Sequence, residues 1–213
     1  IDAPEVCVWT SYKIAIADLV ANGGSSLDLN NVDTPLVIFP AWGNQQGVVM
    51  QVDNVRLTKG AGDSDGSGGN ETGGELTING GFETGDTSGW TSFAVDNNGT
   101  FVVTDTEANG GTFSGNLVAD GAGSFPLIKQ ANLGIGEVSP NTEITISFDL
   151  YGSVAGDGGV FFAEFFSELE TEGTSSHTML GGGPLFPDAS WTNYSFTTTT
   201  GNDVSGGVSL QFK

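Results

Sequence analysis

Aromatic and acidic side chains alternate along one predicted strand, residues 160–169. With a period of two, Phe162, Glu164, Phe166 and Glu168 share one face of this strand. A solvated face rarely carries two Phe, and a buried face rarely carries two Glu. Rings beside carboxylates suit a sugar, which offers an apolar C–H face and a rim of hydroxyls. The pattern therefore predicts a carbohydrate-binding surface, with packing of this face under a loop as the alternative. The opposite face carries the residues expected in the core: Phe161, Ala163, Phe165 and Leu169.

A second strand, residues 144–151, alternates as cleanly and adds two candidate ligand contacts. Asp149 and Tyr151 are predicted to face outward from it. If both strands belong to one sheet, these two side chains join Phe162, Glu164 and Phe166 on a single binding surface. The predicted core face of the strand consists of Ile144, Ile146, Phe148 and Leu150.

Catalytic chemistry has little support in this sequence. The only histidine, His177, lies among small polar residues and is predicted on a surface loop. The Cα atoms of Glu164 and Glu168 would lie roughly 13 Å apart on a strand, too far apart for a retaining glycosidase pair. No nucleophile elbow, histidine metal pair or phosphate loop is found. We expect a non-enzymatic protein without catalytic residues.

Composition narrows the class of partner. The chain has 213 residues, with 26 Asp and Glu against 5 Lys and Arg, which gives a formal charge of −21. So acidic a protein repels nucleic acid and anionic polysaccharides, and favours neutral ligands or divalent cations. Many Gly, Thr, Ser and Val residues with few long charged side chains predict an all-β fold. No apolar run approaches the length that spans a membrane.

The phrase from Leu76 to Trp90 contains an Asn-Gly-Gly-Phe-Glu block, residues 79–83, followed by Gly89-Trp90. This opening resembles family 4/9/22-type (CenC-like) carbohydrate-binding modules. The resemblance implies an antiparallel jelly-roll β-sandwich of galactose-binding-like type over residues 76–213, in which Trp90 is structural. Core residues are also predicted near the end of the chain: Tyr194, Phe196, Val208, Leu210 and Phe212.

Residues 35–57 resemble the end of the galactose-binding-like domain appended to marine exo-glucanases of the ExoP type. Residues 1–58 are therefore predicted to be the C-terminal part of a separate β-sandwich, with strands at 5–16, 36–39 and 48–57. Residues 59–75, rich in Gly, Ser and Asp, are predicted to be a flexible acidic linker. This resemblance implies a secreted or cell-surface bacterial protein that binds a neutral glucan, with a laminarin-like β-1,3-glucan as the first candidate.

A structural calcium ion is implied by the first resemblance. In such modules the opening Glu and an Asp of the closing strand help to hold the ion. Glu83 matches the opening Glu, and Asp53 matches the closing Asp, although Asp53 lies in the N-terminal segment. Oxygen ligands on an acidic chain suit calcium. The alternative is that Glu83 is a solvent-exposed turn residue.

The resembled modules close with a strand that residues 76–213 lack, which would leave an open sheet edge. Residues 48–57 have the alternating pattern to fill it. The segment from 58 to 76 reaches up to roughly 60 Å when extended, so closure within one chain is possible. Closure between chains would give self-association, and with it the alternative function of a calcium-stabilised structural or adhesive protein that assembles into filaments. A third possibility is a closing strand that lies outside this sequence.

Overall fold

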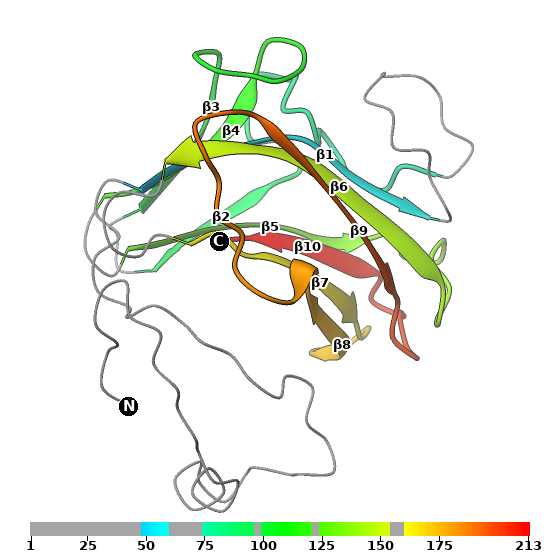
Figure 1. The fold of residues 1–213 in the computed structure, drawn as a ribbon. Coiled ribbons are helices and arrows are strands. Elements are labelled where there is room, and N and C mark those ends of the chain that lie inside the picture. Colours follow the sequence, from blue (N-terminus) through cyan, green and yellow to red (C-terminus); the bar gives the residue numbers. More distant parts are fainter. Residues whose placement is uncertain (1–47, 60–73, 96–98, 121–123, 154–159) are drawn as a thin grey trace, which may run out of the picture. The chain divides into compact units, whose positions relative to one another are not determined.

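In the computed structural model, ten antiparallel strands form two five-stranded sheets within the described residues, which are 48–59, 74–95, 99–120, 124–153 and 160–213 (Figure 1). All of them belong to the unit Phe39–Lys213. Sheet A has the order β3 (Gly99–Thr104), β4 (Ser114–Ala119), β1 (Val48–Lys59), β6 (Glu143–Ser153) and β9 (Thr192–Thr199). Sheet B has the order β2 (Thr91–Val95), β5 (Phe125–Leu133), β10 (Val208–Phe212), β7 (Ala163–Glu168) and β8 (Thr174–Met179). The predicted antiparallel β-sandwich is confirmed.

The helical content of the described residues is a single short 3-10 turn, Leu180–Gly182, after β8. None of the helices in this part of the chain is long and apolar enough to cross a membrane. The strands predicted at 5–16 and 36–39 lie outside the described residues, as does most of the predicted linker.

Strand β1 occupies the centre of sheet A, between β4 and β6, and pairs with both. The predicted domain boundary at residue 58 therefore does not separate β1 from the sandwich of residues 76–213. The physical reason is that Met50, Val52, Val55 and Leu57 are buried in the same core as the side chains of β6. Closure within one chain, one of the two routes considered for residues 48–57, is the arrangement that the structure shows.

The chain returns beside β1 immediately after the undescribed residues 60–73. Thr58 forms a bridge with Glu75, and the Leu76 amide donates to the Leu57 carbonyl at 2.9 Å. The Val55 amide donates to the Gly80 carbonyl, also at 2.9 Å. The opening phrase of the second predicted domain is thus hydrogen-bonded to the end of β1.

A β-bulge in β1 lets apolar residues at both ends of the strand face the core. The register with β6 shifts between Asp53 and Arg56, and Asn54 adopts a φ of 49°. Asn tolerates this left-handed conformation better than most residues. Because of the extra residue, Val52 and Val55 both point inward, although they are separated by three positions. Asp53 then faces away from the core.

Aromatic packing joins the opening phrase to both sheets. Phe82 is fully buried and stacks on Trp90 with ring centroids 5.5 Å apart. Trp90 in turn stacks on Phe212 of β10 at 5.8 Å, which confirms its structural role. Phe148 of β6 contacts Phe212 edge-on at 4.9 Å. The predicted core positions of β6 and β10 are all buried, and Tyr194 and Phe196 of β9 pack half-buried against them.

Gly80 provides a direct test of how the opening phrase packs on β1. A Cβ atom at this position would lie 1.9 Å from the Val55 carbonyl oxygen, a backbone atom that cannot rotate away. We expect Gly80→Ala to lower the free energy of unfolding by about 1–3 kcal/mol, as overpacking does. Urea denaturation followed by tryptophan fluorescence measures this change. At Gly74, where a Cβ would meet nothing within 4 Å, the same substitution serves as the control and should be nearly neutral. Equal effects at the two positions would contradict the packing.

Candidate functional site

The five predicted ligand-contact residues lie on opposite sides of the sandwich. Asp149 and Tyr151 belong to β6 in sheet A, whereas Glu164 and Phe166 belong to β7 in sheet B, with Phe162 just before it. The prediction that they share one surface is wrong, because alternation along a strand identifies its two faces but not the sheet that the strand joins. The outer face of each sheet, meaning the face turned away from the core, has to be considered by itself.

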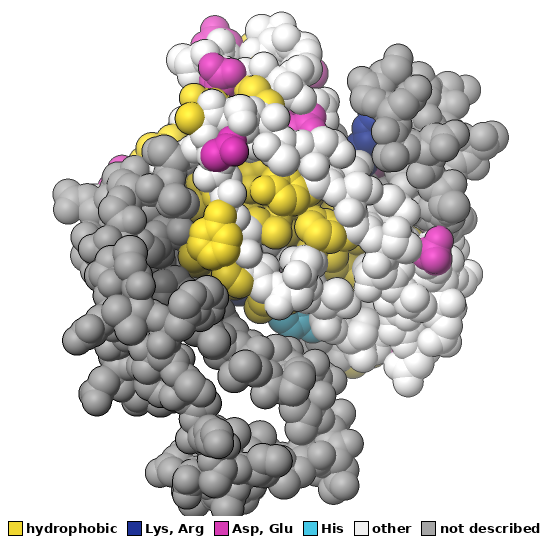
Figure 2. Space-filling view, in the orientation of Figure 1, with side chains coloured by type: hydrophobic (Ala, Val, Ile, Leu, Met, Phe, Trp, Pro, Cys, Tyr) yellow, Lys and Arg dark blue, Asp and Glu magenta, His cyan; other side chains and the backbone are white. Residues whose placement is uncertain are grey.

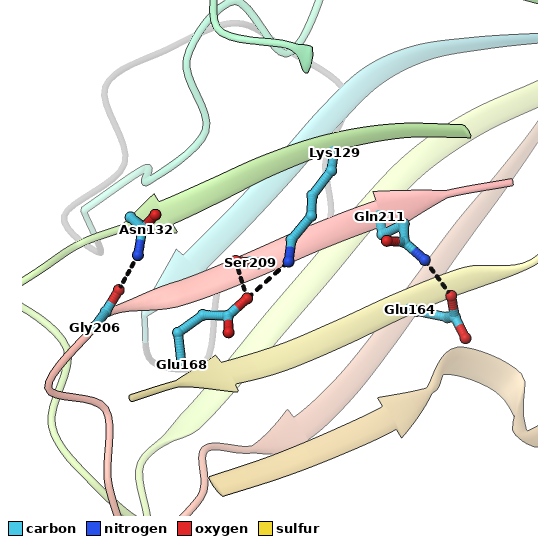
Figure 3. A network of polar contacts seen from close by, with 7 residues as sticks. All are labelled: Lys129, Asn132, Glu164, Glu168, Gly206, Ser209 and Gln211. Carbon is cyan, nitrogen blue, oxygen red and sulfur yellow. Dashed lines mark hydrogen bonds and ion pairs between the residues drawn. The ribbon is translucent and has the colours of Figure 1, made fainter. Parts of the chain in front are cut away.

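On the outer face of sheet B, Glu164 accepts a hydrogen bond from Gln211 (Figure 3), and Lys213 and His177 lie beside it as well. Its side chain is only 3% exposed. The Lys213 Nζ lies 2.7 Å from Oε2, and the Gln211 amide donates to the same oxygen at 2.6 Å. The His177 Nε2 lies 3.2 Å from Oε1. Both carboxylate oxygens are therefore engaged within the protein.

Glu168 and the two Phe rings of this face are engaged in the same way. Lys129 Nζ lies 2.8 Å from Glu168 Oε1, which also accepts a hydrogen bond from Ser209 at 2.6 Å. The same Nζ lies 4.9 Å from the centre of the Phe166 ring, whose plane stacks on His177 at 4.6 Å. Phe162 is 2% exposed. Its ring lies 5.6 Å from Lys213 Nζ. Covered rings and paired carboxylates offer a sugar few free groups, so the alternative of a packed face fits sheet B better.

His177 lies within β8, opposite Phe166, and not on the predicted surface loop. The alternation of Ser and Thr around it concealed an edge strand, because short polar side chains are typical of loops as well as of exposed strands. Its side chain remains 43% exposed.

On the outer face of sheet A, Tyr151 and Trp191 form a half-buried aromatic pair. Their ring centroids lie 5.5 Å apart and the planes are inclined by 32°. Trp191 immediately precedes β9, the edge strand beside β6. Its indole Nε1 donates to Glu107 Oε1 at 2.9 Å, which fixes the orientation of the ring. A fixed and partly exposed ring pair is a suitable platform for an apolar sugar face.

A row of polar side chains continues from this pair across the sheet. Gln51 of β1 is the cross-strand partner of Tyr151 on one side and of Asn116 of β4 on the other. Val102 of β3 pairs with Asn116 and ends the row, with 48% of its surface exposed. The buried Oδ1 of Asn116 has no hydrogen-bond partner among the described residues. The amide of the half-buried Asn116 can both donate to and accept from a sugar hydroxyl, whereas Gln51 is only 5% exposed and is not open to a ligand.

Asp149 lies next to this row but belongs to a buried network of carboxylates and amides. Its Oδ2 accepts hydrogen bonds from the side chains of Asn54 and Asn109, both at 2.8 Å, and its Oδ1 accepts one from Asn193 at 2.7 Å. The residue is 5% exposed. Asp149 therefore orients the amides around it, and the predicted direct contact with a ligand does not fit its surroundings.

Asp53 and Glu83 hold the connection between β3 and β4, residues 105–113, from two directions. Asp53 accepts the backbone N–H groups of Asn109 and Gly110 at 2.8 and 3.0 Å. Glu83 accepts those of Thr112 and Phe113, at 3.0 and 2.9 Å. Glu107 lies in the same connection, so these two carboxylates position the side chain that orients Trp191.

Calcium binding at Asp53 and Glu83 stays a prediction, because their oxygens accept hydrogen bonds in this structure. The oxygens of Asp53 and Glu83 face N–H donors, which cannot coordinate a cation. In the described part of the chain, no group of three or more His, Cys, Asp or Glu residues could hold a metal ion. Glu83 is exposed in a turn, as the alternative to calcium binding expected, and both carboxylates also anchor the connection between β3 and β4.

Sequence reasoning missed Gln51, Glu107 and Asn116 at this face. The outward positions of Gln51 and Asp53 could have been inferred from the alternation of residues 48–53. Glu107 and Asn116 could not, because their proximity to Trp191 and Gln51 depends on the order of strands in sheet A.

The comparisons with known proteins add little to this geometry. No family model matches the chain, and no curated protein matches its sequence. Among solved structures, the chain is similar to TmCBM61, determined in complex with β-1,4-galactotriose, at 14% identity and a TM-score of 0.27. The match covers 64% of this chain and 84% of that chain. Because this TM-score is low, the assignment of the fold rests on the strand pairing described above.

Asp53 gives the site a measurable pH dependence. Burial raises the pKa of its carboxyl above the ordinary 3.8, and the nearby Asp149 charge adds to this, while N–H donors from Gly110, Asn54 and Asn109 oppose it. A raised folded-state pKa means that its contribution to stability is full below the ordinary pKa and is lost as pH rises through the folded-state value. We therefore expect the difference in free energy of unfolding between wild type and Asp53→Ala to shrink as pH rises from the ordinary pKa through the folded-state value. Urea titrations at a series of pH values measure this difference.

Asp203 is the matched control for this pH dependence. Hydrogen bonds from Ser205 lower the pKa of its exposed carboxyl. Its contribution should therefore have the opposite sign: present above the ordinary pKa and lost as pH falls through the folded-state value. If the Asp53 difference grew with rising pH, as the Asp203 difference should, the burial argument would be wrong.

Proposed function

We propose that this chain is a non-catalytic carbohydrate-binding module whose site is the outer face of sheet A. The observation that carries the proposal is the half-buried Tyr151–Trp191 pair, whose indole is held by Glu107. Rings bind the apolar face of a sugar, and the half-buried amide of Asn116 offers a partner for a hydroxyl. Of the residues first predicted to bind the ligand, the proposed site keeps Tyr151 and leaves out Phe162, Glu164 and Phe166.

A neutral polysaccharide is the ligand class that the charges favour. The chain carries a formal charge of −21, and Glu107 lies directly at the aromatic pair. An anionic glycan would be repelled by both. A laminarin-like β-1,3-glucan remains our first candidate because of the resemblance of residues 35–57 to a segment of marine exo-glucanases. The same resemblance supports a place outside the bacterial cell, secreted or at its surface.

Four of the described carboxylates have structural partners, which supports a role without catalysis for them. A general acid or base must reach the scissile bond of the substrate. Asp53 and Asp149 are buried and enclosed by N–H donors. Glu164 and Glu168 are paired with Lys213 and Lys129. Each of these four groups already has a structural partner.

The alternative, an adhesive protein that assembles by strand donation, is no longer supported by the argument that suggested it. It rested on an open sheet edge, and β1 fills the corresponding position from within the same chain. Assembly through β1 would require this strand to leave the centre of sheet A and give up its pairing with two neighbours.

Affinity electrophoresis in laminarin gels tests the proposed site. We expect wild type to be retarded and Trp191→Ala to migrate as in a gel without glycan, because truncation removes the indole face from the ligand. Loss of an aromatic contact of this kind costs at least about 1 kcal/mol, or fivefold in affinity. Circular dichroism should show that the variant retains its β structure.

Two matched variants locate the ligand on one face. Phe93→Ala removes a ring that is 49% exposed on sheet B, and Phe166→Ala removes one of the residues first predicted to bind. Both should be retarded like wild type as long as they stay folded. Retardation that is lost in Phe166→Ala but kept in Trp191→Ala would move the site to sheet B, and an unretarded wild type would contradict laminarin as ligand. Further gels with lichenan, xylan and β-1,4-galactan would then decide whether any neutral glycan binds.

A further inference from the structure

The connection from β8 to β9 crosses from sheet B to sheet A and is fixed to both. Leu185 exchanges two backbone hydrogen bonds with Phe161, at 2.7 and 3.1 Å, next to β7. The Asp188 carbonyl accepts the amide of Gly152 of β6 at 3.0 Å. The Asp188 side chain accepts both the amide and the hydroxyl of Ser190. These bonds hold the connection in one conformation on both sides of Phe186.

Phe186 is presented outward by this fixed connection. Its exposed fraction, 62%, is the highest among the large hydrophobic residues that the structure describes as exposed. The next residue, Pro187, is buried and restricts the backbone of Phe186 to extended conformations. Single exposed hydrophobic residues are common. A ring whose backbone is fixed on both sides, however, loses little conformational entropy when a ligand covers it.

The connection leads directly into the proposed site. Gly152, whose amide donates to the Asp188 carbonyl, directly follows Tyr151. Trp191 directly follows Ser190, whose hydroxyl donates to the Asp188 side chain. Trp191 is five positions after Phe186 in the chain, so their Cα atoms are at most about 18 Å apart. On the face where this connection crosses between the sheets, hydrophobic side chains gather in the middle and acidic ones lie above them (Figure 2).

We propose that Phe186 is a second aromatic contact for the ligand, so that the binding site continues from the Tyr151–Trp191 pair around the edge of sheet A. This inference rests on the proposed function. It makes the ligand a chain of several sugar units, and it makes Phe186 a residue that selects for chain length. A sugar unit bound at Trp191 is the same in short and long ligands, whereas only a longer ligand also reaches Phe186.

Isothermal titration calorimetry with laminaribiose and laminarihexaose tests this inference on the full chain. Wild type should bind the hexasaccharide more tightly than the disaccharide. Phe186→Ala should weaken hexasaccharide binding about fivefold, the effect of one truncated aromatic contact, and leave disaccharide binding unchanged. Phe93→Ala, with an exposed ring on sheet B, should change neither. If the disaccharide binds too weakly for titration, its competition against the hexasaccharide gives the same comparison.

The outcomes separate this inference from the proposed function. Hexasaccharide binding that is equal in wild type and Phe186→Ala, while Trp191→Ala abolishes it, would overturn the inference and leave the proposed function standing. An equal loss of affinity for both ligands in Phe186→Ala would also overturn the inference, because Phe186 would then affect binding at the Tyr151–Trp191 pair itself. Binding of neither ligand by wild type would contradict the glucan and the inference together.

Discussion

The pairing of β1 with two neighbours determines the rest of the structure. Strands β4 and β6 are joined in sheet A through β1, which is hydrogen-bonded to both. Its inward side chains fill the core, and Asp53, which directly precedes the bulge, lies on the outer face by simple alternation. Asp53 then holds the connection that carries Glu107, and Glu107 orients Trp191. The proposed site therefore depends on a strand that precedes most of the sandwich in the sequence.

Basic residues occur on both sheets: Arg56 and Lys59 belong to β1 in sheet A, whereas Lys129 and Lys213 lie on sheet B. Lys129 and Lys213, two of only five, lie on sheet B together with the single histidine and neutralise two carboxylates there. On sheet A, the buried Asp53 and Asp149 are stabilised by N–H donors of the backbone and of Asn side chains. Dipolar donors do not cancel the charge of these two carboxylates, while their amides remain compatible with sugar hydroxyls. This difference favours a neutral ligand on sheet A.

Local alternation was enough to predict much of the fold. The core faces of residues 144–150 and 208–212 and the structural role of Trp90 follow from the period of two and from the opening phrase. The sheet to which each strand belongs could not be predicted, because it depends on contacts between distant segments. For that reason Tyr151 was correctly placed facing outward but was combined with rings of the other sheet. Asp149 was predicted as an exposed ligand contact, and three Asn donors from separate segments make it a buried anchor instead.

Native-state hydrogen exchange of β1 tests the central claim most directly. If β1 is the central strand of sheet A, the amides of residues 50–53 that pair with β4 and β6 should exchange only through global unfolding. Their protection should then match that of β6, residues 144–150, and should fall with it in low concentrations of denaturant. Rapid exchange in β1 while β6 remains protected would contradict the account, because β1 would then open without the sandwich.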